Sequence, residues 1–164
     1  MSFQSNLYAL LFRRYPAVSF DIFDTLLERD VARPVDVFPR VGDRVLGAGK
    51  GAAFRADRIA AETAARAVAE NGEVTLDDIY DALVSAGYDR TQAEALRAEE
   101  VRCELEGCFV KSSMKPVYDK ALRQGKRVFL VSDMYLPKDV IADMAKKCGY
   151  ESYETLCVSN EYGV

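Results

Sequence analysis

The stretch VSFDIFDTLLERD, residues 18–30, decides the fold of this chain. A short apolar run ends in two carboxylates, Asp21 and Asp24, and apolar residues then resume. Short apolar runs are typical of strands buried on both faces of a parallel sheet, so residues 17–20 are predicted to form a first strand. Ligands bind beyond the carboxyl ends of such strands, which is where Asp21 falls.

Two further strands are predicted downstream, at residues 128–131 and 155–158. A segment with an early proline and a closing glycine precedes each of them, PVYDKALRQG at 116–125 and PKDVIADMAKKCG at 137–149. Proline in the first turn and glycine after the last turn favour helices over both segments. Alternating strands and helices indicate right-handed βαβ crossovers and an α/β fold with a Rossmann-like, three-layer parallel-sheet core.

Residues 35–112 have a different pattern, rich in Ala, Arg and Glu with helical periodicity and without a convincing strand. Thr75 and Asp78 form a predicted capping pair, and Thr91 and Glu94 repeat that pattern before a segment that reaches about residue 108. We therefore expect an all-helical insertion after the first strand.

This pattern divides the chain into a core and a cap. The α/β core is predicted to comprise residues 1–34 and 113–164, and residues 35–112 are the predicted helical cap.

Composition excludes several kinds of chemistry. The chain has 164 residues and no histidine, which rules out imidazole bases and histidine-ligated zinc. The net charge of −4, with Lys and Arg dispersed, argues against nucleic acid as a partner. No apolar run is long enough to span a membrane, and four cysteines without a CxxC pair indicate reduced thiols in the cytoplasm.

Carboxylates and hydroxyls at the strand ends are therefore the candidate reactive groups. Asp21 can act as a nucleophile toward a phosphoryl or alkyl centre. Attack on a phosphate dianion requires a hard cation such as Mg²⁺ to offset the repulsion between the two negative charges. Ser132 ends the second predicted strand, and its hydroxyl can donate to a phosphoryl oxygen.

FDIFDTLL, residues 20–27, resembles motif I of the haloacid dehalogenase superfamily, and LVSDMYLP, residues 130–137, resembles motif II. The helical insertion matches the position of that superfamily's cap. With EVTLDDIYDAL, these motifs also look like a bacterial branch of predicted hydrolases associated with polysaccharide-synthesis and glycosyltransferase proteins. The resemblance spans nearly the whole chain.

The resemblance implies a role for each motif residue. Asp21 would be the nucleophile and a Mg²⁺ ligand, and the backbone carbonyl of Phe23 would be a second ligand. Thr25 and Ser132 would position the phosphoryl group of a small substrate, such as a sugar phosphate. Asp133 is assigned either to substrate or to the turn that leads into Pro137.

Asp24 and Thr25 each have two open readings. Asp24 is a candidate for proton transfer, or for a helix N-cap that accepts from the amides near Leu26 or Leu27. Thr25 contacts phosphate, or it serves packing and local hydrogen bonding.

Two departures from the phosphatase pattern bear on activity. In the phosphatases of the haloacid dehalogenase superfamily, the general acid stands two residues after the nucleophile, and in this chain that residue is Phe23. The superfamily's later lysine and metal-binding acids do not occur before Val164, which predicts that the chain is a fragment of a longer protein. The first strand would then have a bare edge.

Three functions remain open at this stage. The first is Mg²⁺-dependent phosphate-ester hydrolysis through an aspartyl-phosphate on Asp21. The second is a catalytically degenerate binding domain of a polysaccharide-biosynthesis protein, and the third is carbon–halogen hydrolysis.

Several charged residues could contribute specificity. Arg55, Glu62 and Arg66 of the predicted cap could face the site, and Lys111 and Lys115 could reach an anionic substrate, although a solvated surface position is the alternative for each.

Overall fold

A computed structural model describes residues 14–162 of the chain, and its main sheet consists of three parallel strands. These strands are β1 (Ala17–Asp21), β4 (Arg127–Ser132) and β5 (Thr155–Val158), in the order β1-β4-β5. All three predicted strands are confirmed, and with them the α/β fold built on a parallel sheet. The register sets Asp21 opposite Val131, and Val131 opposite Cys157, at the carboxyl edge.

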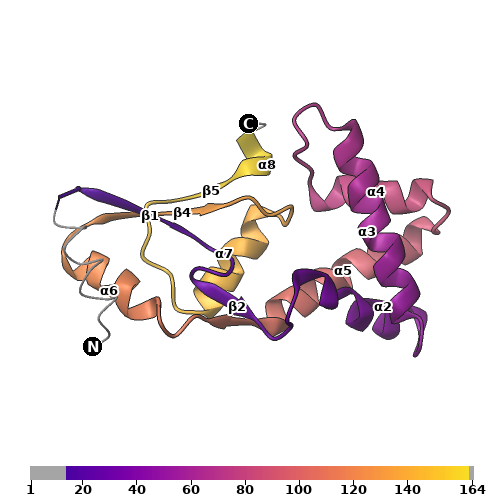
Figure 1. Cartoon of the computed structure of the whole chain (residues 1–164), viewed down its shortest axis with the longest axis horizontal. Coiled ribbons are helices and arrows are strands. Elements are labelled where there is room, and N and C mark those ends of the chain that lie inside the picture. Colours follow the sequence, from indigo (N-terminus) through magenta and orange to yellow (C-terminus); the bar gives the residue numbers. More distant parts are fainter. Residues whose placement is uncertain (1–13, 163–164) are drawn as a thin grey trace.

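Two helices cover one face of this sheet. Helices α6 (Lys115–Arg123) and α7 (Lys138–Lys147) lie on the same side of the strands (Figure 1). Right-handed crossovers that step in one direction across a sheet place their helices on one face. Phe20, Leu130 and Val158 are buried beneath these helices.

The opposite face of the sheet explains a difference from the prediction for residues 17–20. Ser19 is exposed and Val131 is 41% exposed, so burial on both faces is wrong for the described part of the chain. Neither crossover supplies a helix to that face. Within residues 14–162, β1 is also an edge strand, as the sequence predicted.

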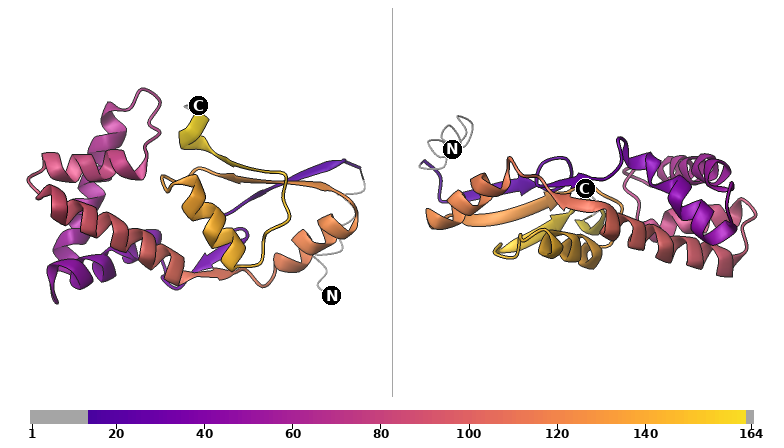
Figure 2. Two further views of the ribbon diagram at one scale, coloured as in Figure 1. Left: turned by 180° about the vertical axis from the view of Figure 1, so that it is seen from behind. Right: turned by 90° about the horizontal axis from the view of Figure 1, so that it is seen from below.

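A helical insertion follows the first strand and forms the end of the molecule opposite helix α6 (Figures 1 and 2). We use this name for the four helices α2 (Phe38–Leu46), α3 (Gly51–Val68), α4 (Leu76–Ser85) and α5 (Arg90–Gly107), with the 3₁₀ turn η1 (Pro34–Asp36) before them. Its own core contains the buried side chains of Phe54, Ile79, Leu83 and Leu96.

Two predicted helix starts have different outcomes. The Thr75 hydroxyl accepts from the Asp78 amide and the Asp78 carboxylate accepts from the Thr75 amide, so this capping box is confirmed. The prediction at Thr91 is wrong, because α5 already begins at Arg90. The cap is Asp89, whose carboxylate accepts from the Gln92 amide at 3.2 Å.

A short antiparallel ribbon joins the insertion to the core. Strand β2 (Leu27–Arg29) pairs with β3 (Cys108–Val110). Strand β3 lies inside the segment 35–112 that was predicted to lack strands. Three residues of a two-stranded ribbon give too short a pattern to distinguish from the end of a helix.

The contact between α2 and α3 leads to a stability prediction at Gly51. A Cβ placed on Gly51 would overlap the carbonyl oxygen of Pro39 and lie 2.8 Å from its Cα. Backbone cannot move aside as a flexible side chain can, so Gly51→Ala should lower the free energy of unfolding by about 1–3 kcal/mol in urea denaturation. The exposed neighbour Ala52, changed to Ser, is the control and should cost less than about 0.5 kcal/mol. Equal midpoints for the two variants would contradict the close approach.

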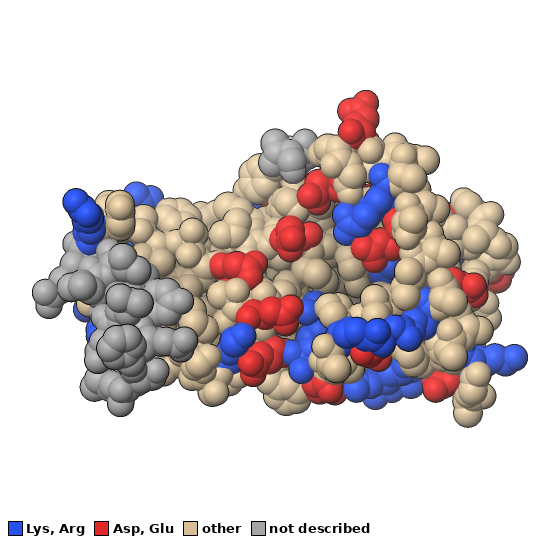
Figure 3. Space-filling view, in the orientation of Figure 1, with Lys and Arg blue, Asp and Glu red and all other residues tan. Residues whose placement is uncertain are grey.

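The remaining described element is the short helix α8 (Ser159–Tyr162), which follows β5. On the face shown in Figure 3, basic and acidic side chains are interspersed over the insertion. Among the helices of residues 14–162, none has both the length and the apolar character required to cross a membrane.

Candidate active site

Asp21 lies at the carboxyl end of β1, and its side chain is exposed to a hollow of about 440 Å³. The Thr25 hydroxyl donates to Asp21 Oδ2 at 2.7 Å. One carboxylate oxygen is thereby held by a local hydrogen bond. The hollow is lined by Asp21, Val131, Ser132, Asp133, Cys157, Val158, Ser159 and Tyr162.

Ser132 ends β4 next to this hollow. The residue is only 4% exposed, and its Oγ accepts from the Met134 amide at 3.2 Å. That bond stabilises the turn after the strand and holds the Ser132 oxygen in place. The structure thus brings Asp21, Ser132 and Asp133 together around one hollow, with Thr25 attached to Asp21.

Asp24 does not cap a helix. The amides of Leu26 and Leu27 both donate to the carbonyl of Ile22, at 2.8 and 2.9 Å, and the chain continues into β2 instead of a helix. Asp24 itself has φ = 58°, in the left-handed region that Asp tolerates better than most residues. The N-cap reading is therefore wrong, because a backbone turn already takes the amides that the carboxylate was expected to bind.

Lys111 and Lys115, the two lysines noted in the sequence, both bind groups of the folded chain. Lys111 Nζ donates to the carbonyl oxygen of Asp24 at 2.6 Å, and Lys115 pairs with Asp119 one turn along α6. Lys111 thus supports the turn after Asp21. Neither lysine lines the hollow that contains Asp21.

Asp133 is exposed at the rim of the hollow. Within residues 14–162 no side chain caps the start of α7 at Pro137, so the alternative that Asp133 caps this turn is wrong. The Ser132 hydroxyl makes the turn's hydrogen bond instead.

The oxygen atoms at and after Asp21 are of the chemical kind that Mg²⁺ prefers as ligands. The Asp21 carboxylate and the carbonyl of Phe23 are hard oxygen ligands, and Mg²⁺ commonly takes one or two protein carboxylates and completes its shell with water and substrate. Within residues 14–162, no group of three or more Asp, Glu, Cys or His side chains is placed to hold a metal. The two ligands that the resemblance names are of the chemical kind that Mg²⁺ prefers, and Mg²⁺ binding by them stays a prediction.

Sequence reasoning missed three residues that line this hollow, namely Cys157, Ser159 and Tyr162. They belong to the end of β5 and to α8. The available signal was their position, because the carboxyl ends of parallel strands meet at one edge of the sheet.

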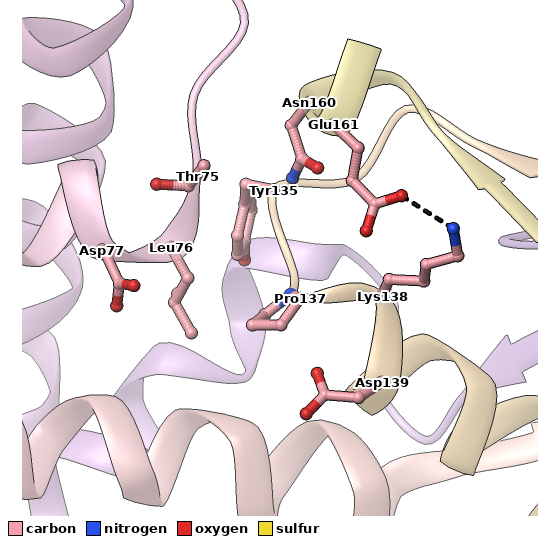
Figure 4. Close-up of a pocket in the computed structure, with 9 residues that line it drawn as sticks. All are labelled: Thr75, Leu76, Asp77, Tyr135, Pro137, Lys138, Asp139, Asn160 and Glu161. Atoms are coloured by element: carbon pink, nitrogen blue, oxygen red, sulfur yellow. Dashed lines mark hydrogen bonds and ion pairs between the residues drawn. The ribbon is translucent and has the colours of Figure 1, made fainter.

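A second hollow, of about 470 Å³, lies between the insertion and the core (Figure 4). Thr75 and Leu76 face Tyr135 and Pro137 across it, and Lys138 pairs with Glu161 at 2.8 Å. The Leu76 amide also donates to the Tyr135 carbonyl at 2.8 Å. The loop that follows Ser132 thus touches the insertion directly.

The cap residues noted in the sequence pair within the segment they belong to. Arg55 lies 3.3 Å from Asp36, and Arg66 lies 3.0 Å from Glu62, which also accepts from Arg58. None of these three candidates lines either hollow described above.

Searches with known proteins give structural matches only. No family model matches the sequence, and no curated protein matches it. The HAD-hydrolase YfnB from Bacillus subtilis, whose crystal structure contains magnesium and reveals interdomain movement, is similar with a TM-score of 0.58 and 17% identity. That match covers 91% of this chain and 67% of YfnB.

A second solved structure is the 2-haloacid dehalogenase from Pseudomonas syringae pv. tomato. It aligns with a TM-score of 0.52 and 17% identity, over 90% of this chain and 65% of the dehalogenase. The chain thus spans about two thirds of the length of each. The parallel sheet, the helical insertion after its first strand and these two likenesses together show that the chain has the fold of the haloacid dehalogenase superfamily.

Proposed function

We propose that this chain is part of a hydrolase that cleaves phosphate esters with Mg²⁺ and uses Asp21 as the nucleophile. The observation that supports this most directly is the position of the Asp21 carboxylate. It is exposed at the carboxyl edge of the sheet, with Thr25 bonded to one oxygen and Ser132 lining the same hollow. The expectation from motifs I and II agrees with this arrangement.

The proposed reaction has two displacements at phosphorus. Asp21 Oδ1 attacks, an O–P bond to the carboxylate forms, and the bond to the ester oxygen breaks as the alcohol leaves. Water then attacks the phosphorus of the aspartyl-phosphate, which releases inorganic phosphate and restores the carboxylate. Thr25 donates to one lone pair of Oδ2, so Oδ2 keeps a second lone pair for a metal while Oδ1 is the attacking oxygen.

The Asp21 carboxylate and the Phe23 carbonyl would hold Mg²⁺, which when bound offsets the negative charges of nucleophile and phosphate. The Ser132 hydroxyl would donate to a phosphoryl oxygen. The alcohol must leave with a proton that Phe23 cannot supply. Proton transfer from Asp24 stays a proposal, and its exposed carboxylate lies on the same turn.

The substrate class is proposed from the same resemblance. A small phosphorylated molecule, such as a sugar phosphate, would suit an enzyme of polysaccharide assembly that works with or is joined to a glycosyltransferase. The placement of Asp133 at the rim allows it to contact the part of a substrate beyond the phosphoryl group.

Replacing Asp21 by Asn should remove turnover. Asn preserves the shape of Asp but lacks the nucleophilic charge, so hydrolysis of 4-nitrophenyl phosphate with Mg²⁺ should fall by roughly 10³-fold or more. The matched control is Asp139→Asn, an exposed aspartate of the second hollow, which should leave the rate within about twofold. A rate of the Asp21→Asn variant equal to that of the wild type would contradict the assignment of Asp21 as the nucleophile.

A second candidate is a binding domain without turnover. Phe23 in the acid position favours it, as does the lining of the Asp21 hollow, which among the described residues contains no lysine. Equal inertness of wild type and Asp21→Asn, together with a rise in melting temperature caused by a phosphorylated sugar, would decide for this candidate.

A third candidate is dehalogenation, which the likeness to a 2-haloacid dehalogenase and the non-acidic Phe23 favour. Halide release from a 2-haloacid without added metal would identify it.

A further inference from the structure

Arg29, the last residue of β2, lies where three segments of the chain meet. Its side chain is only 7% exposed. It contacts Phe23 after β1, Met134 after β4, and Glu104 on α5 of the insertion. No motif in the sequence indicated a role for Arg29 or Glu104.

The first contact stacks Arg29 on the turn that follows Asp21. The guanidinium carbon lies 4.4 Å from the ring centroid of Phe23. A desolvated cation–π contact of this kind is among the stronger ones. Because the carbonyl of Phe23 is a proposed Mg²⁺ ligand, a force that holds the ring also holds the direction of that carbonyl.

The second contact connects the same guanidinium to the insertion. Arg29 Nε donates to Glu104 Oε2 at 3.0 Å, and the Glu104 side chain is 1% exposed. Among residues 14–162, the other oxygen, Glu104 Oε1, is buried without a hydrogen-bond partner. Burial raises the pKa of Glu104, and the charge of Arg29 opposes that rise. Within the described part of the chain, Arg29 is thus the one hydrogen-bond donor to the Glu104 carboxylate.

The third contact reaches the loop that begins at Ser132. Arg29 Nη2 lies 3.8 Å from Met134 Sδ, and the Met134 amide donates to Ser132 Oγ. One guanidinium therefore touches both loops that bear the proposed reactive groups, and its ion pair ties it to α5.

We propose that Arg29 is a positioning residue that couples the insertion, through Glu104, to the turn that carries Asp21 and Phe23. A shift of α5 then displaces the guanidinium, and the turn moves with it. Lysine cannot replace this function, because it lacks the planar face that stacks on Phe23 while a fixed N–H donates to Glu104. The inference deepens the proposed function and rests on it for the metal, but the coupling itself is testable without turnover.

The experiment combines metal binding with amide exchange. The variants are Arg29→Met, Arg29→Lys, Glu104→Gln and the double variant Arg29→Met/Glu104→Gln. Mn²⁺, followed by electron paramagnetic resonance of the free ion, serves as the probe for the Mg²⁺ site. Hydrogen exchange at the Leu26 and Leu27 amides, which donate to Ile22, reports on the turn. If the Arg29→Met variant does not fold, the Arg29→Lys variant, which keeps the positive charge, tests the same coupling.

Each single variant should weaken Mn²⁺ binding by about 10- to 100-fold, the usual effect of removing a group that orients a metal ligand. The same variants should speed exchange at the Leu26 and Leu27 amides by at least about tenfold and leave the amides of α3 unchanged. In the Arg29→Met background, Glu104→Gln should have no further effect, since the coupling runs through Arg29. Glu106→Gln is the matched control on the same helix, because Glu106 pairs at the surface with Arg44 and Arg102.

The outcomes separate this inference from the proposed function. Absence of Mn²⁺ binding by the wild type would contradict the metal-dependent function, and faster exchange at the two turn amides would still support the coupling. Unchanged turn exchange in Arg29→Lys and Glu104→Gln would overturn the coupling, whatever the metal result. Additive effects of the two substitutions would overturn it as well.

Discussion

Replacing Glu100 by alanine should lower the free energy of unfolding by about 3–5 kcal/mol, the cost of breaking a buried ion pair from one side. Glu100 accepts from Arg58 through both oxygens, each at 2.8 Å, and both side chains are 0% exposed. The Tyr80 hydroxyl donates to the same carboxylate at 2.7 Å. Among the residues that the structure describes, removal of Glu100 leaves the buried guanidinium with Glu62, at 3.2 Å, as its one remaining ion-pair partner.

The pKa shifts of Arg58 and Tyr80 also indicate that the loss of Glu100 is costly. Burial lowers the pKa of the Arg58 guanidinium, but the charge of Glu100, its hydrogen bonds with Arg58 and the neighbouring tyrosines together outweigh burial, and the net shift is upward. Burial raises the pKa of the Tyr80 hydroxyl, and the charge of Glu100 raises it further. Arg58 therefore stays charged in the folded state, and its partner cannot be removed without cost.

Urea denaturation of the wild type, Glu100→Ala and Glu106→Ala is the measurement. Glu106 also lies on α5 and pairs with two arginines, Arg44 of α2 and Arg102 of α5, but it is solvent-exposed, so its loss should cost far less than the loss of Glu100. The double variant Arg58→Met/Glu100→Leu should recover part of the lost stability, because it removes the unpaired charge. Equal costs for the two alanine variants would contradict the account.

This ion pair also touches the loop that follows Ser132. The Arg58 guanidinium carbon lies 4.8 Å from the ring centroid of Tyr135, and Tyr135 is buried against the insertion. Loss of Glu100 should therefore loosen the contact between the insertion and the loop, as well as destabilise the insertion itself.

Relative to Phe23→Asn, which also lacks the ring that Arg29 contacts, Phe23→Asp should speed hydrolysis of esters with poor leaving groups by roughly 10²- to 10⁴-fold, the usual contribution of a positioned proton donor. The prediction rests on the proposed function. A phenolate with a strong electron-withdrawing group leaves without a proton, whereas an alkoxide needs one. The gain should therefore be large with an alkyl phosphate and small with 4-nitrophenyl phosphate.

Arg29 lies over the ring of Phe23, so a carboxylate introduced there would meet a guanidinium. That charge lowers the pKa of the new carboxyl, and the gain should be largest at acid pH, where more of the carboxyl is protonated. Phe23→Asn is the control, since it matches Asp in size and cannot transfer a proton. An equal rate in the Asn and Asp variants would show that position 23 has no part in proton transfer.

The sequence predicted well those features that short-range patterns encode. Apolar runs marked the three strands, and proline and glycine marked the helices α6 and α7. The hydroxyl of Thr75 and the carboxylate of Asp78, three residues apart, predicted a capping box that the structure confirms. The strand ends then placed Asp21 and Ser132 on one edge, because parallel strands share their direction.

The errors about helix caps concern groups with more than one available hydrogen-bond partner. Asp24 resembled a helix cap, but the Ile22 carbonyl takes the amides of Leu26 and Leu27. Thr91 resembled a cap, but Asp89 lies two residues earlier and reaches the amide of Gln92. Local sequence shows which groups can form a hydrogen bond, and competition within the folded chain decides which of them do.

By itself, then, the sequence determined the strands of the parallel sheet, the helices of the insertion and the carboxylate at the end of the first strand, since each of these elements depends on residues that are near one another in the chain. Only the tertiary structure decided that Arg29 meets Glu104, 75 residues away, and that Arg58 meets Glu100, 42 residues away. Charged residues on a helix are usually solvated, so their pattern does not reveal burial. Burial and pairing of these charges follow from how α3, α5 and β2 pack, which no periodicity in the sequence encodes.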